Sequence, residues 1–598
     1  MRRALGWLCG TAMVLAGPSG TAWAAVIFKV GSAPGATHRT IQAAVDAAIA
    51  SGARPTEIRV ASQRFSEHVV VSGLAEGQSL LLRGGYDAAF TPREAGSPTT
   101  VLDGGGAGPV LEVDGDAGKV TVDGFTVTNA GGASDLGQFA ISVDLRGRAQ
   151  VTLDHLEVRD NVVRSASLAG PSGLLGIVAG SALFRLRRSV FSGNRSEATE
   201  KGSAVAGAAR IFTGEHSYVE VSKCQFRENV SMAPTQAYQA ALDINAEAAA
   251  VVHVDDSVFS DNRARSSSGG ASGILYLGLA GSTLGGAHVR AERDVFRHNA
   301  VDGGAIVVLS SDSDPILFSD SLLADELGDA VRAEVLNRNI NLYNLTIASH
   351  SGYGLVVEPT NPGDQVRLAN TIFFHNGHLV RGAVEAVGSM FTVDPLFIDA
   401  AAGDYRLRWE SPAIDSGDNT PRLGLGRADV TGGPRLVGPF VDAGAYETPS
   451  REGRCRVLWP LEVDADSGAC RCASDASLRE FRCHVPAGDL NLSFAVPLDW
   501  KPGAVDVGWD LTALRDLGAY TLTTEVLVGG KPAAPSSSLD PASGVLVKGQ
   551  TAHHVARPWF GAQADQFLRA TVEARAPGEA APRRWQVELI VPAGLPPN

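Results

Sequence analysis

Residues 219–229 read Val-Glu-Val-Ser-Lys-Cys-Gln-Phe-Arg-Glu-Asn, and the pattern of this stretch recurs along much of the chain. Apolar residues stand seven and five positions before an apolar anchor, Phe226, and an asparagine stands three positions after it. Successive anchors lie 24 to 37 residues apart, and self-similarity at such a period predicts a solenoid. The nine anchors are Val127, Val158, Phe191, Phe226, Phe259, Phe296, Leu323, Ile347 and Phe373.

The two positions before the anchor identify the repeating element as a strand. Both are apolar in all nine repeats. Successive side chains on a strand point to opposite faces, so apolar residues at i and i+2 place one face inward. The long, variable period and Gly-rich stretches such as 202–207 leave room for further short strands in each turn. The pattern therefore predicts a coil of β-structure rather than a helical repeat.

Asparagine after the anchor is the second repeated signal. Asn tolerates left-handed backbone, and stacked turns would let each amide bond to the equivalent amide one turn away. We therefore expect an internal ladder of turn residues rather than a set of ligands. The residues are Asn161, Asn194, Asn229, Asn262, Asn299 and Asn376, three positions after their anchors, and Asn129, two positions after.

With these Phe-x-x-Asn elements and Gly-Gly-Ala-Ile at 303–306, the chain resembles right-handed parallel β-helix proteins of the pectin-lyase-like superfamily and the repeats of bacterial surface proteins. Residues 40–45 are similar to the entry of that fold, where a short helix covers the open end before a first strand at 58–60. An uncovered end would expose unpaired strands and apolar rungs. The apolar face of this helix would contain Ile41, Val45, Ala48 and Ile49.

Three later segments resemble the choice-of-anchor Q segment that ends many exported β-helix proteins: 394–397, 411–417 and 441–447. The resemblance is specific for fold and unspecific for activity. It implies an all-β chain with an N-terminal cap and first strands at 25–100, a right-handed parallel β-helix at 101–393 and the end of the solenoid at 394–448.

The first 24 residues have the order of a secretory signal peptide. Arg2 and Arg3 precede an apolar run over 4–16, and Ala-Trp-Ala at 22–24 favours cleavage before Ala25. That apolar run is too short to span a bilayer, and no later segment is long and apolar enough. We expect export to the periplasm, the cell surface or the extracellular space.

Charge restricts the partners. The chain has a net charge of −14, and loss of Arg2 and Arg3 with the signal peptide changes it to −16. An acidic balance argues against nonspecific nucleic-acid binding and favours solubility outside the cell. A polysaccharide or a cell-surface partner is the expectation that remains, and the sequence leaves the oligomeric state open.

Four of the six cysteines, Cys455, Cys470, Cys472 and Cys483, fall within 29 residues near the C-terminus. An even cluster in an exported chain predicts two disulfides. Cys470 and Cys472 are too close to pair comfortably, so we expect each to pair with one of the outer two. The alternative is a structural zinc site, but the spacing of one residue between Cys470 and Cys472 differs from the usual Cys-x-x-Cys.

The template is missing after residue 448, and residues 448–453 are typical of a linker. Strand-like alternation occurs at 490–494, 520–526 and 585–591, between turns with Pro and Gly. We predict a C-terminal β-sandwich at 449–598, a length within the usual range of a domain.

Between the inward positions, the strands present charged side chains outward. Solubility and edge protection account for them in general, but parallel β-helices also grip polysaccharides along such faces. We therefore identify these residues as candidate ligand-binding positions: Arg185, Arg187, Glu220, His253, Asp255, Arg290 and Glu292.

Catalysis would need more than a set of outward charged side chains. A uronate lyase needs a cation beside the carboxylate and a base near the C5 proton, and a glycosidase needs two carboxylates that flank one bond. The chain lacks the motifs of polygalacturonases, pectin methylesterases and metal-dependent pectate lyases. The candidate catalytic residues are Arg188, Lys223 and Asp256, each of which stands three positions before an anchor. A rise of about 4.8 Å per turn puts Arg188 and Asp256 ~10 Å apart.

Calcium is a further candidate ligand, because residues 415–419 are rich in oxygen-bearing side chains. They lack the bidentate Glu of an EF-hand loop, and Asx turns explain them as well. No cofactor or other metal is expected. Two function classes remain: a noncatalytic exported module that binds glycans or partners, and a polysaccharide lyase or glycoside hydrolase.

Overall fold

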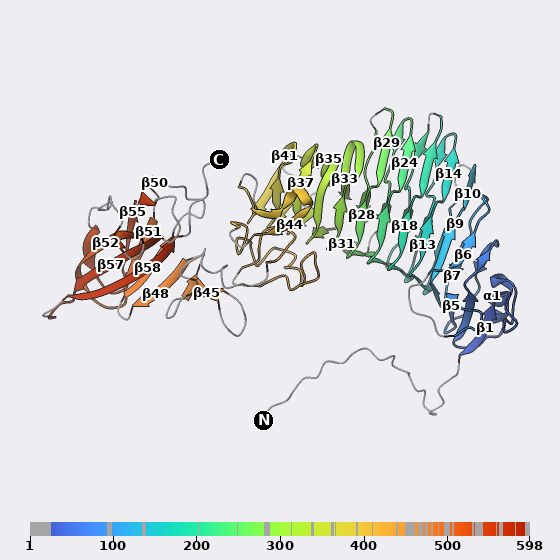
Figure 1. Ribbon diagram of the computed structural model, residues 1–598, viewed down its shortest axis with the longest axis horizontal. Coiled ribbons are helices and arrows are strands. Elements are labelled where there is room, and N and C mark those ends of the chain that lie inside the picture. The colour runs from blue at the N-terminus through green and yellow to red at the C-terminus, as the bar shows by residue number, and fades with distance from the viewer. Residues whose placement is uncertain are drawn as a thin grey trace, which may run out of the picture.

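The computed structural model describes residues 25–448 with short gaps and, beyond residue 460, the strands and some of the turns that connect them. The gaps before residue 449 are 92–97, 134–138, 201, 248, 269, 280–287, 313, 336–339, 360, 362–363, 365, 390–392, 409–410 and 438–439. The regular secondary structure of the described residues is nearly all β, and parallel strands stack along one long axis (Figure 1). The predicted fold class, a right-handed parallel β-helix, is confirmed.

Face A is a sheet of thirteen parallel strands, one from each turn of the coil. Its strands hold the two apolar positions before each anchor, and all eighteen of these residues are buried. The strands in spatial order are β1 (Val26–Val30), β2 (Thr56–Ala61), β5 (Ser79–Tyr86), β8 (Lys119–Asp123), β12 (Gln150–Asp154), β17 (Leu183–Arg187), β22 (Tyr218–Ser222), β27 (Val251–Asp255), β31 (His288–Glu292), β34 (Ile316–Ser319), β36 (Ile340–Tyr343), β39 (Val366–Ala369) and β42 (Val384–Val387).

Face B contains the anchors, and all nine are buried. The rings of Phe191, Phe226, Phe259 and Phe296 stack in the core, with centroids 5.2, 5.0 and 4.6 Å apart. The strands of face B are β3 (Arg64–Phe65), β6 (Thr100–Asp103), β9 (Phe125–Thr128), β13 (Glu157–Arg159), β18 (Val190–Ser192), β23 (Gln225–Arg227), β28 (Val258–Ser260), β32 (Val295–Arg297), β35 (Leu322–Val335), β37 (Thr346–His350) and β40 (Ile372–Phe374).

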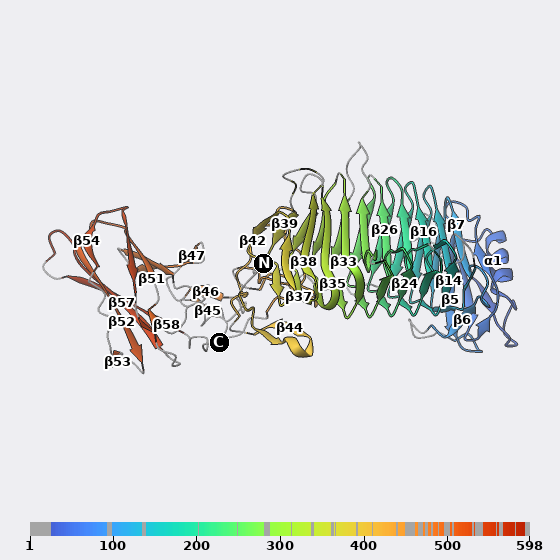
Figure 2. The ribbon, with the colours of Figure 1, turned by 90° about the horizontal axis from the view of Figure 1, so that it is seen from above.

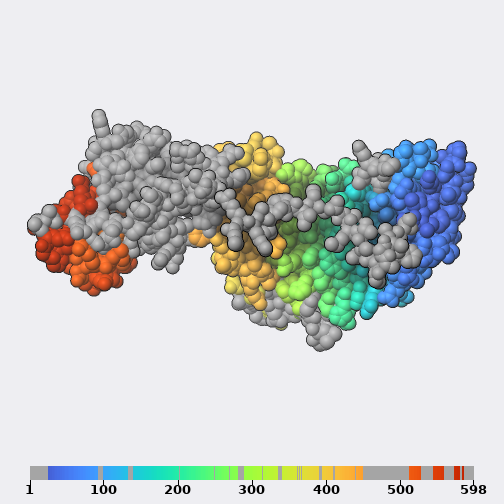
Figure 3. All heavy atoms as spheres, turned by 90° about the horizontal axis from the view of Figure 1, so that it is seen from below, coloured from blue at the N-terminus to red at the C-terminus, as the bar shows by residue number. Residues whose placement is uncertain are grey.

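Face C closes the coil, and the long strand β35 pairs with strands of both face B and face C. A small parallel sheet of β15 (Leu168–Ala169), β20 (Ser203–Ala204) and β25 (Gln236–Ala237) extends three turns. The strands of face C are β4 (Val69–Val71), β7 (Leu111–Gly115), β10 (Gly131–Ala133), β11 (Ile141–Leu145), β14 (Val162–Ser165), β16 (Leu174–Val178), β19 (Arg195–Ala198), β21 (Ala209–Thr213), β24 (Val230–Ala233), β26 (Leu242–Ala246), β29 (Arg263–Ser266), β30 (Leu275–Leu279), β33 (Ala300–Ser311), β38 (Tyr353–Pro359) and β41 (His378–Arg381). The turns follow one another in chain order along the axis (Figures 2 and 3).

The predicted asparagine ladder is present between faces B and C. The Nδ2 of each residue from Asn161 to Asn262 donates to the Oδ1 of the next, at 2.9 to 3.0 Å. The ladder continues from Asn299 to the carboxyl of Glu326, at 3.0 Å. The expectation that Asn129 belongs to the ladder is wrong, because its exposed amide donates to Asp103 instead, at 2.9 Å.

The predicted N-terminal helix is α1 (Ile41–Ala50), and Thr40 caps it by accepting a hydrogen bond from the backbone of Ala43. Its buried residues include Ile41, Val45 and Ala48, which pack on the end of the core. Residues 58–60 do form a strand, but they belong to β2, so the expectation that they form the first strand is wrong. The first strand is β1, which pairs with β2 at the end of face A.

Residues 394–448 form what we call the covering segment, which contains β43 (Phe397–Asp399), the 3₁₀ turn η1 (Ala400–Ala402) and β44 (Asp404–Leu407). It packs against the outer side of face B at its last turns. Leu322, Ala324, Ala348 and Ile372 of face B share a buried cluster with apolar residues of the covering segment. Its contacts with the solenoid are therefore lateral.

The C-terminal region consists of antiparallel strands, and the three strands predicted at 490–494, 520–526 and 585–591 are present. One five-stranded sheet contains β47 (Ser477–Arg479), β48 (Arg482–Ala487), β49 (Leu490–Ala495), β51 (Val507–Ala513) and β55 (Thr551–Ala556). A second contains β52 (Gly518–Val528), β53 (Lys531–Pro532), β54 (Ala542–Leu546), β57 (Gln566–Arg575) and β58 (Arg583–Val591). Two further pairs are β45 (Leu461–Val463) with β46 (Cys470–Cys472), and β50 (Gly503–Ala504) with β56 (Trp559–Phe560).

Some expectations lie outside the described residues. The signal peptide at 1–24 does, and so do Cys455 and the side chains of Cys470, Cys472 and Cys483, so the disulfides stay predictions. No helix in the described part of the chain is long and apolar enough to cross a membrane.

Candidate functional site

A column of turn residues joins face A to face B, and it contains all three candidate catalytic residues. Arg188, Lys223, Asp256 and Arg293 occupy the same position in four consecutive turns, with φ values between 47° and 60°. We call these four residues the turn column. Left-handed backbone at this position turns the chain sharply from face A into face B. The backbone N–H of each residue still donates to a carbonyl of the next turn, so the column is held in register.

The outer two candidates have separate ion-pair partners. Arg188 donates backward to Asp154, at 2.9 Å from Nε to Oδ1. Asp256 accepts forward from Arg293, at 2.7 Å from Nε and 3.4 Å from Nη2. The turn column therefore brings the three candidates into one row, but neither Arg188 nor Asp256 has a charge free of a protein partner.

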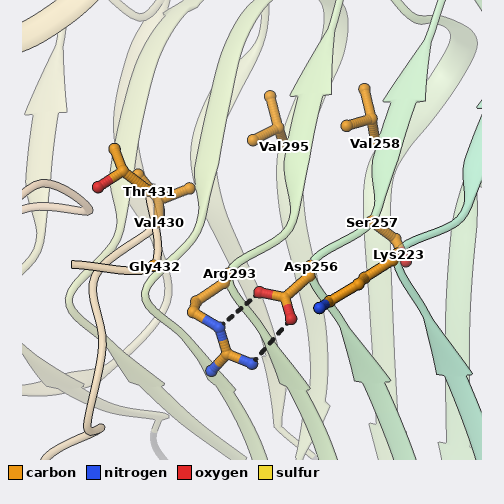
Figure 4. A pocket seen from close by; sticks show the side chains of 9 residues that line it. All are labelled: Lys223, Asp256, Ser257, Val258, Arg293, Val295, Val430, Thr431 and Gly432. Carbon is orange, nitrogen blue, oxygen red and sulfur yellow. Dashed lines mark hydrogen bonds and ion pairs between the residues drawn. The ribbon is translucent and has the colours of Figure 1, made fainter. Parts of the chain in front are cut away.

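Lys223 differs from its neighbours. Its side chain is exposed, and within the described residues no hydrogen bond or ion pair engages its ammonium group. Figure 4 shows the side chain extended along the surface toward Asp256, whose carboxylate is already bound by Arg293 on the other side. Arg293 also donates to Glu292 of face A, at 3.3 Å from Nη1 to Oε2, so Arg293 has two carboxylate partners, whereas the described residues give the ammonium group of Lys223 none.

These residues line a pocket of about 390 Å³ on the outer side of face B. Lys223, Asp256 and Arg293 form its polar edge, and the outward side chains of Val258 and Val295 give it an apolar floor. Residues 430–432 of the covering segment form the opposite wall. A patch that combines cationic, carboxylate and hydroxyl groups with exposed apolar carbon suits a charged sugar, which has a carboxylate, hydroxyls and a C–H face.

The wall is a tight turn that Asp429 organises. Its Oδ1 accepts hydrogen bonds from the backbone of Thr431 and of Gly433, both at 3.0 Å, and from the Thr431 hydroxyl at 2.7 Å. Its Oδ2 accepts from the backbone of Glu447, at 3.0 Å. Val430 packs with Val295 against the buried cluster under the covering segment. The wall is therefore a fixed part of the fold.

The seven outward residues predicted as ligand-binding positions lie on four consecutive strands of face A in two rows. One row contains Arg185, Glu220, His253 and Arg290, and the other contains Arg187, Asp255 and Glu292, with Ser222 between the first two. Arg185 and Arg187 both pair with Glu220, at 3.2 and 2.6 Å, and Arg290 lies 3.6 Å from Glu292. Hydrogen bonds and charge from Arg187 hold the pKa of Glu220 below its usual value although burial opposes this. His253 lies between Glu220 and Arg290 on the neighbouring strands, and burial lowers its pKa.

Asp255 is the exception on this face. Burial, with the charge of Glu292 on the next strand, raises the pKa of Asp255 to about 7. In the chain, Asp255 is the residue directly before Asp256 of the turn column. At neutral pH a large share of Asp255 is uncharged, which limits the negative charge beside the pocket.

Part of the pocket was not predicted from sequence. Arg293 is in register with the three candidates, and its position three before Phe296 was a usable signal. The wall at 430–432 gave no signal of its own. One indirect signal existed: the outward positions of face B change from Gln225 and Arg227 to the apolar Leu322 and Ala324, which indicates that something covers the later turns.

The segment suggested for calcium uses its oxygens within the fold. Asp418 Oδ1 accepts from the backbone and the hydroxyl of Thr420, and Asn419 Oδ1 accepts from the backbone of Val441. Within the described residues, no group of three or more His, Cys, Asp or Glu side chains is placed to hold a metal ion. Calcium at this segment stays a prediction.

No family model matches the chain, and no curated protein matches it. Among solved structures it is similar to pectate lyase Pel9A, with 11% identity over 72% of this chain and 98% of that one, at a TM-score of 0.39. It is also similar to the pectin methylesterase from Aspergillus niger, with 12% identity over 64% of this chain and 93% of that one, at a TM-score of 0.26. At these scores the fold assignment rests on the strand pairing described above.

Proposed function

We propose that this protein is an exported module that binds an acidic polysaccharide without cleaving it, and that the pocket at the turn column is its binding site. The observation behind this proposal is Lys223, an exposed ammonium group in a pocket that already contains a complete Asp256–Arg293 pair. A carboxylate from the ligand would pair with this ammonium group.

The rest of the pocket matches the other parts of a uronate sugar. Asp256 and the Thr431 hydroxyl are placed to bond with sugar hydroxyls, and Val258 and Val295 are placed to pack on the C–H face of the ring. Charge-assisted hydrogen bonds to a carboxylate are the strongest of these contacts, so Lys223 would select acidic over neutral sugars.

Binding without cleavage is favoured by how the charges are used. Asp256 is the single carboxylate among the residues that line the pocket, whereas a glycosidase needs two across the scissile bond. Arg188 pairs with Asp154, away from the pocket. The β-strands of the C-terminal region would then serve attachment or recognition.

One observation favours the enzymatic alternative, a polysaccharide lyase or glycoside hydrolase. Asp255, with its raised pKa, lies in register with Glu292 on the next strand, so two carboxyl groups are neighbours on face A. Such a pair is the arrangement of a general acid and its partner. Under this alternative, Asp255→Asn would abolish cleavage of a bound polymer.

Size-exclusion chromatography of the mature protein with acidic and neutral polysaccharides, with separate detection of protein and carbohydrate, tests both functions. We expect co-elution with uncut acidic polymer, and loss of co-elution for Lys223→Ala. The matched control is Lys119→Ala. Lys119 is an exposed lysine at the start of β8, which lies three strands from β22, the strand that Lys223 follows. Shortened polymer would support the enzyme. Equal binding by the two alanine variants would contradict the assigned site.

A further inference from the structure

We infer that the pocket receives the end of an acidic polysaccharide chain rather than its interior, an inference that rests on the function proposed above. A groove that is open at one side and closed by a fixed wall at the other can hold a terminal sugar, whereas a continuing polymer needs two open sides. The pocket has this shape because the covering segment begins to cover face B at the last turn that lines it.

The open side lies toward the N-terminal turns. Gln225 and Arg227, the outward residues of β23, are exposed, and Val258 of the next turn is 38% exposed. Of the described residues of the covering segment, those that line the pocket are the wall at 430–432. A chain that lies along face B therefore has access to the pocket from this side.

The closed side lies at the following turn. Asp320, Ser321 and Leu322 are in register with Arg293, Asp294 and Val295, and all three are at most 1% exposed. Arg435 of the covering segment lies over Asp320, with its Nε 3.3 Å from Oδ1 and its Nη2 bound to two backbone carbonyls at 2.7 and 2.8 Å. A buried ion pair with these hydrogen bonds leaves no path for a polymer between the covering segment and face B.

The wall also offers groups that suit a chain end. Thr431 and Gly432 are exposed at its tip. The Thr431 hydroxyl donates its hydrogen to Asp429, so its oxygen lone pairs stay available to accept from a sugar hydroxyl. A terminal sugar has one more free hydroxyl or hemiacetal group than an interior sugar. The wall would recognise this additional group while Lys223 binds the carboxylate.

Isothermal titration calorimetry with oligomers of galacturonate and of guluronate, each in several defined lengths, tests the inference on the full mature chain. Recognition of ends predicts a fixed number of protein molecules per oligomer chain, whatever its length. Recognition of interior sugars predicts a number that rises in proportion to length. We also expect Thr431→Val to weaken binding by about three- to tenfold, the effect of one lost hydrogen bond.

The outcomes separate the two proposals. In one outcome both kinds of oligomer bind, Lys223→Ala abolishes binding, and the number of bound protein molecules rises with oligomer length. The assigned site is then right, and chain-end recognition is wrong. If neither kind of oligomer binds, or Lys223→Ala binds like Lys119→Ala, the proposed function fails and this inference fails with it. Wild-type affinity of Thr431→Val would also overturn the role of the wall, and a circular dichroism spectrum of that variant checks its folding.

Discussion

Asp256 and Arg293 lie on consecutive turns of the solenoid, and both carboxylate oxygens of Asp256 accept from Arg293, at 2.7 Å from Nε and 3.4 Å from Nη2. Charge from Asp256 and hydrogen bonding to it raise the pKa of Arg293, although burial opposes this effect. Because this pair is complete, Lys223 on the preceding turn adds a positive charge that Asp256 does not balance alone. The Asp256–Arg293 pair thus leaves the ammonium group of Lys223 available to a carboxylate of the ligand.

Arg293→Ala should therefore weaken the binding of acidic oligomers although Lys223 remains. Without Arg293, Asp256 and Glu292 lose the cation that they share, and the Asp256 carboxylate is free to pair with Lys223. We expect a loss of about tenfold or more by calorimetry, the usual scale of a hydrogen bond to a charged group. Arg188→Ala is the matched control, since it removes an arginine of the same column that pairs with Asp154. Equal losses in both variants would mean that only general surface charge matters.

Binding should also weaken as the pH rises from 6 to 8. The pKa of Asp255 is raised to about 7, so the group is mainly protonated at pH 6 and mainly ionised at pH 8, which adds a negative charge beside the pocket. We expect about a threefold change at constant ionic strength, since the added charge is partly screened. Asp255→Asn should bind equally well at both pH values. A pH dependence that persists in this variant would assign it to another group.

The asparagine ladder should contribute strongly to stability. Asn229 is fully buried, and its Nδ2 donates to Asn262 and to the carbonyl of Phe191 at 2.9 and 3.0 Å. Asn229→Ala would remove these two bonds and also the acceptor of the Asn194 backbone N–H and of its Nδ2, at a cost of about 3 kcal/mol in the free energy of unfolding. Thermal unfolding measures this loss. Asn129→Ala is the control, because the exposed Asn129 lies outside the ladder; a similar loss there would contradict our account.

Acid should destabilise the last turns of the solenoid through His350. Burial lowers its pKa to about 4, below the ordinary 6.5, so the folded state resists protonation. The stability due to the neutral ring is present above pH 6.5 and is lost as the pH falls toward 4, by up to about 3 kcal/mol. His350→Asn, which has the residue type of most of the ladder, should flatten this dependence. Unfolding curves between pH 4 and 7 test it, and identical slopes for both proteins would exclude His350 as the cause.

The repeat made most of the solenoid predictable. Inward positions, anchors and ladder residues depend on contacts with the same position one turn away, so one period of sequence contains the information for its own packing. Asn129 failed as a ladder residue because it follows its anchor by two positions, and a shift by one residue moves a side chain to the other side of the chain. The first strand, β1, lies before any repeat and was missed for that reason.

The pocket was predictable only in part. Lys223 and Asp256 were found because they belong to a periodic column, and Arg293 belongs to the same column. Which of these charges pair was not readable from spacing, because Asp256 has a cation on either side and only the side-chain geometry selects Arg293. The wall at 430–432 is more than 130 residues away from Arg293 in the chain, and no periodic pattern relates the two.

The sequence by itself determined the β-helix, its inward residues, the capping helix and the row of outward charges, because all of these follow from local periodicity and from contacts between equivalent positions. Tertiary structure alone decided that residues 394–448 fold back along face B, that Asp429 holds a wall over Val295, and that Lys223 is left beside a completed ion pair. These relationships join segments without a common period, and their geometry depends on side-chain packing and charge pairing between parts of the chain that are distant in sequence.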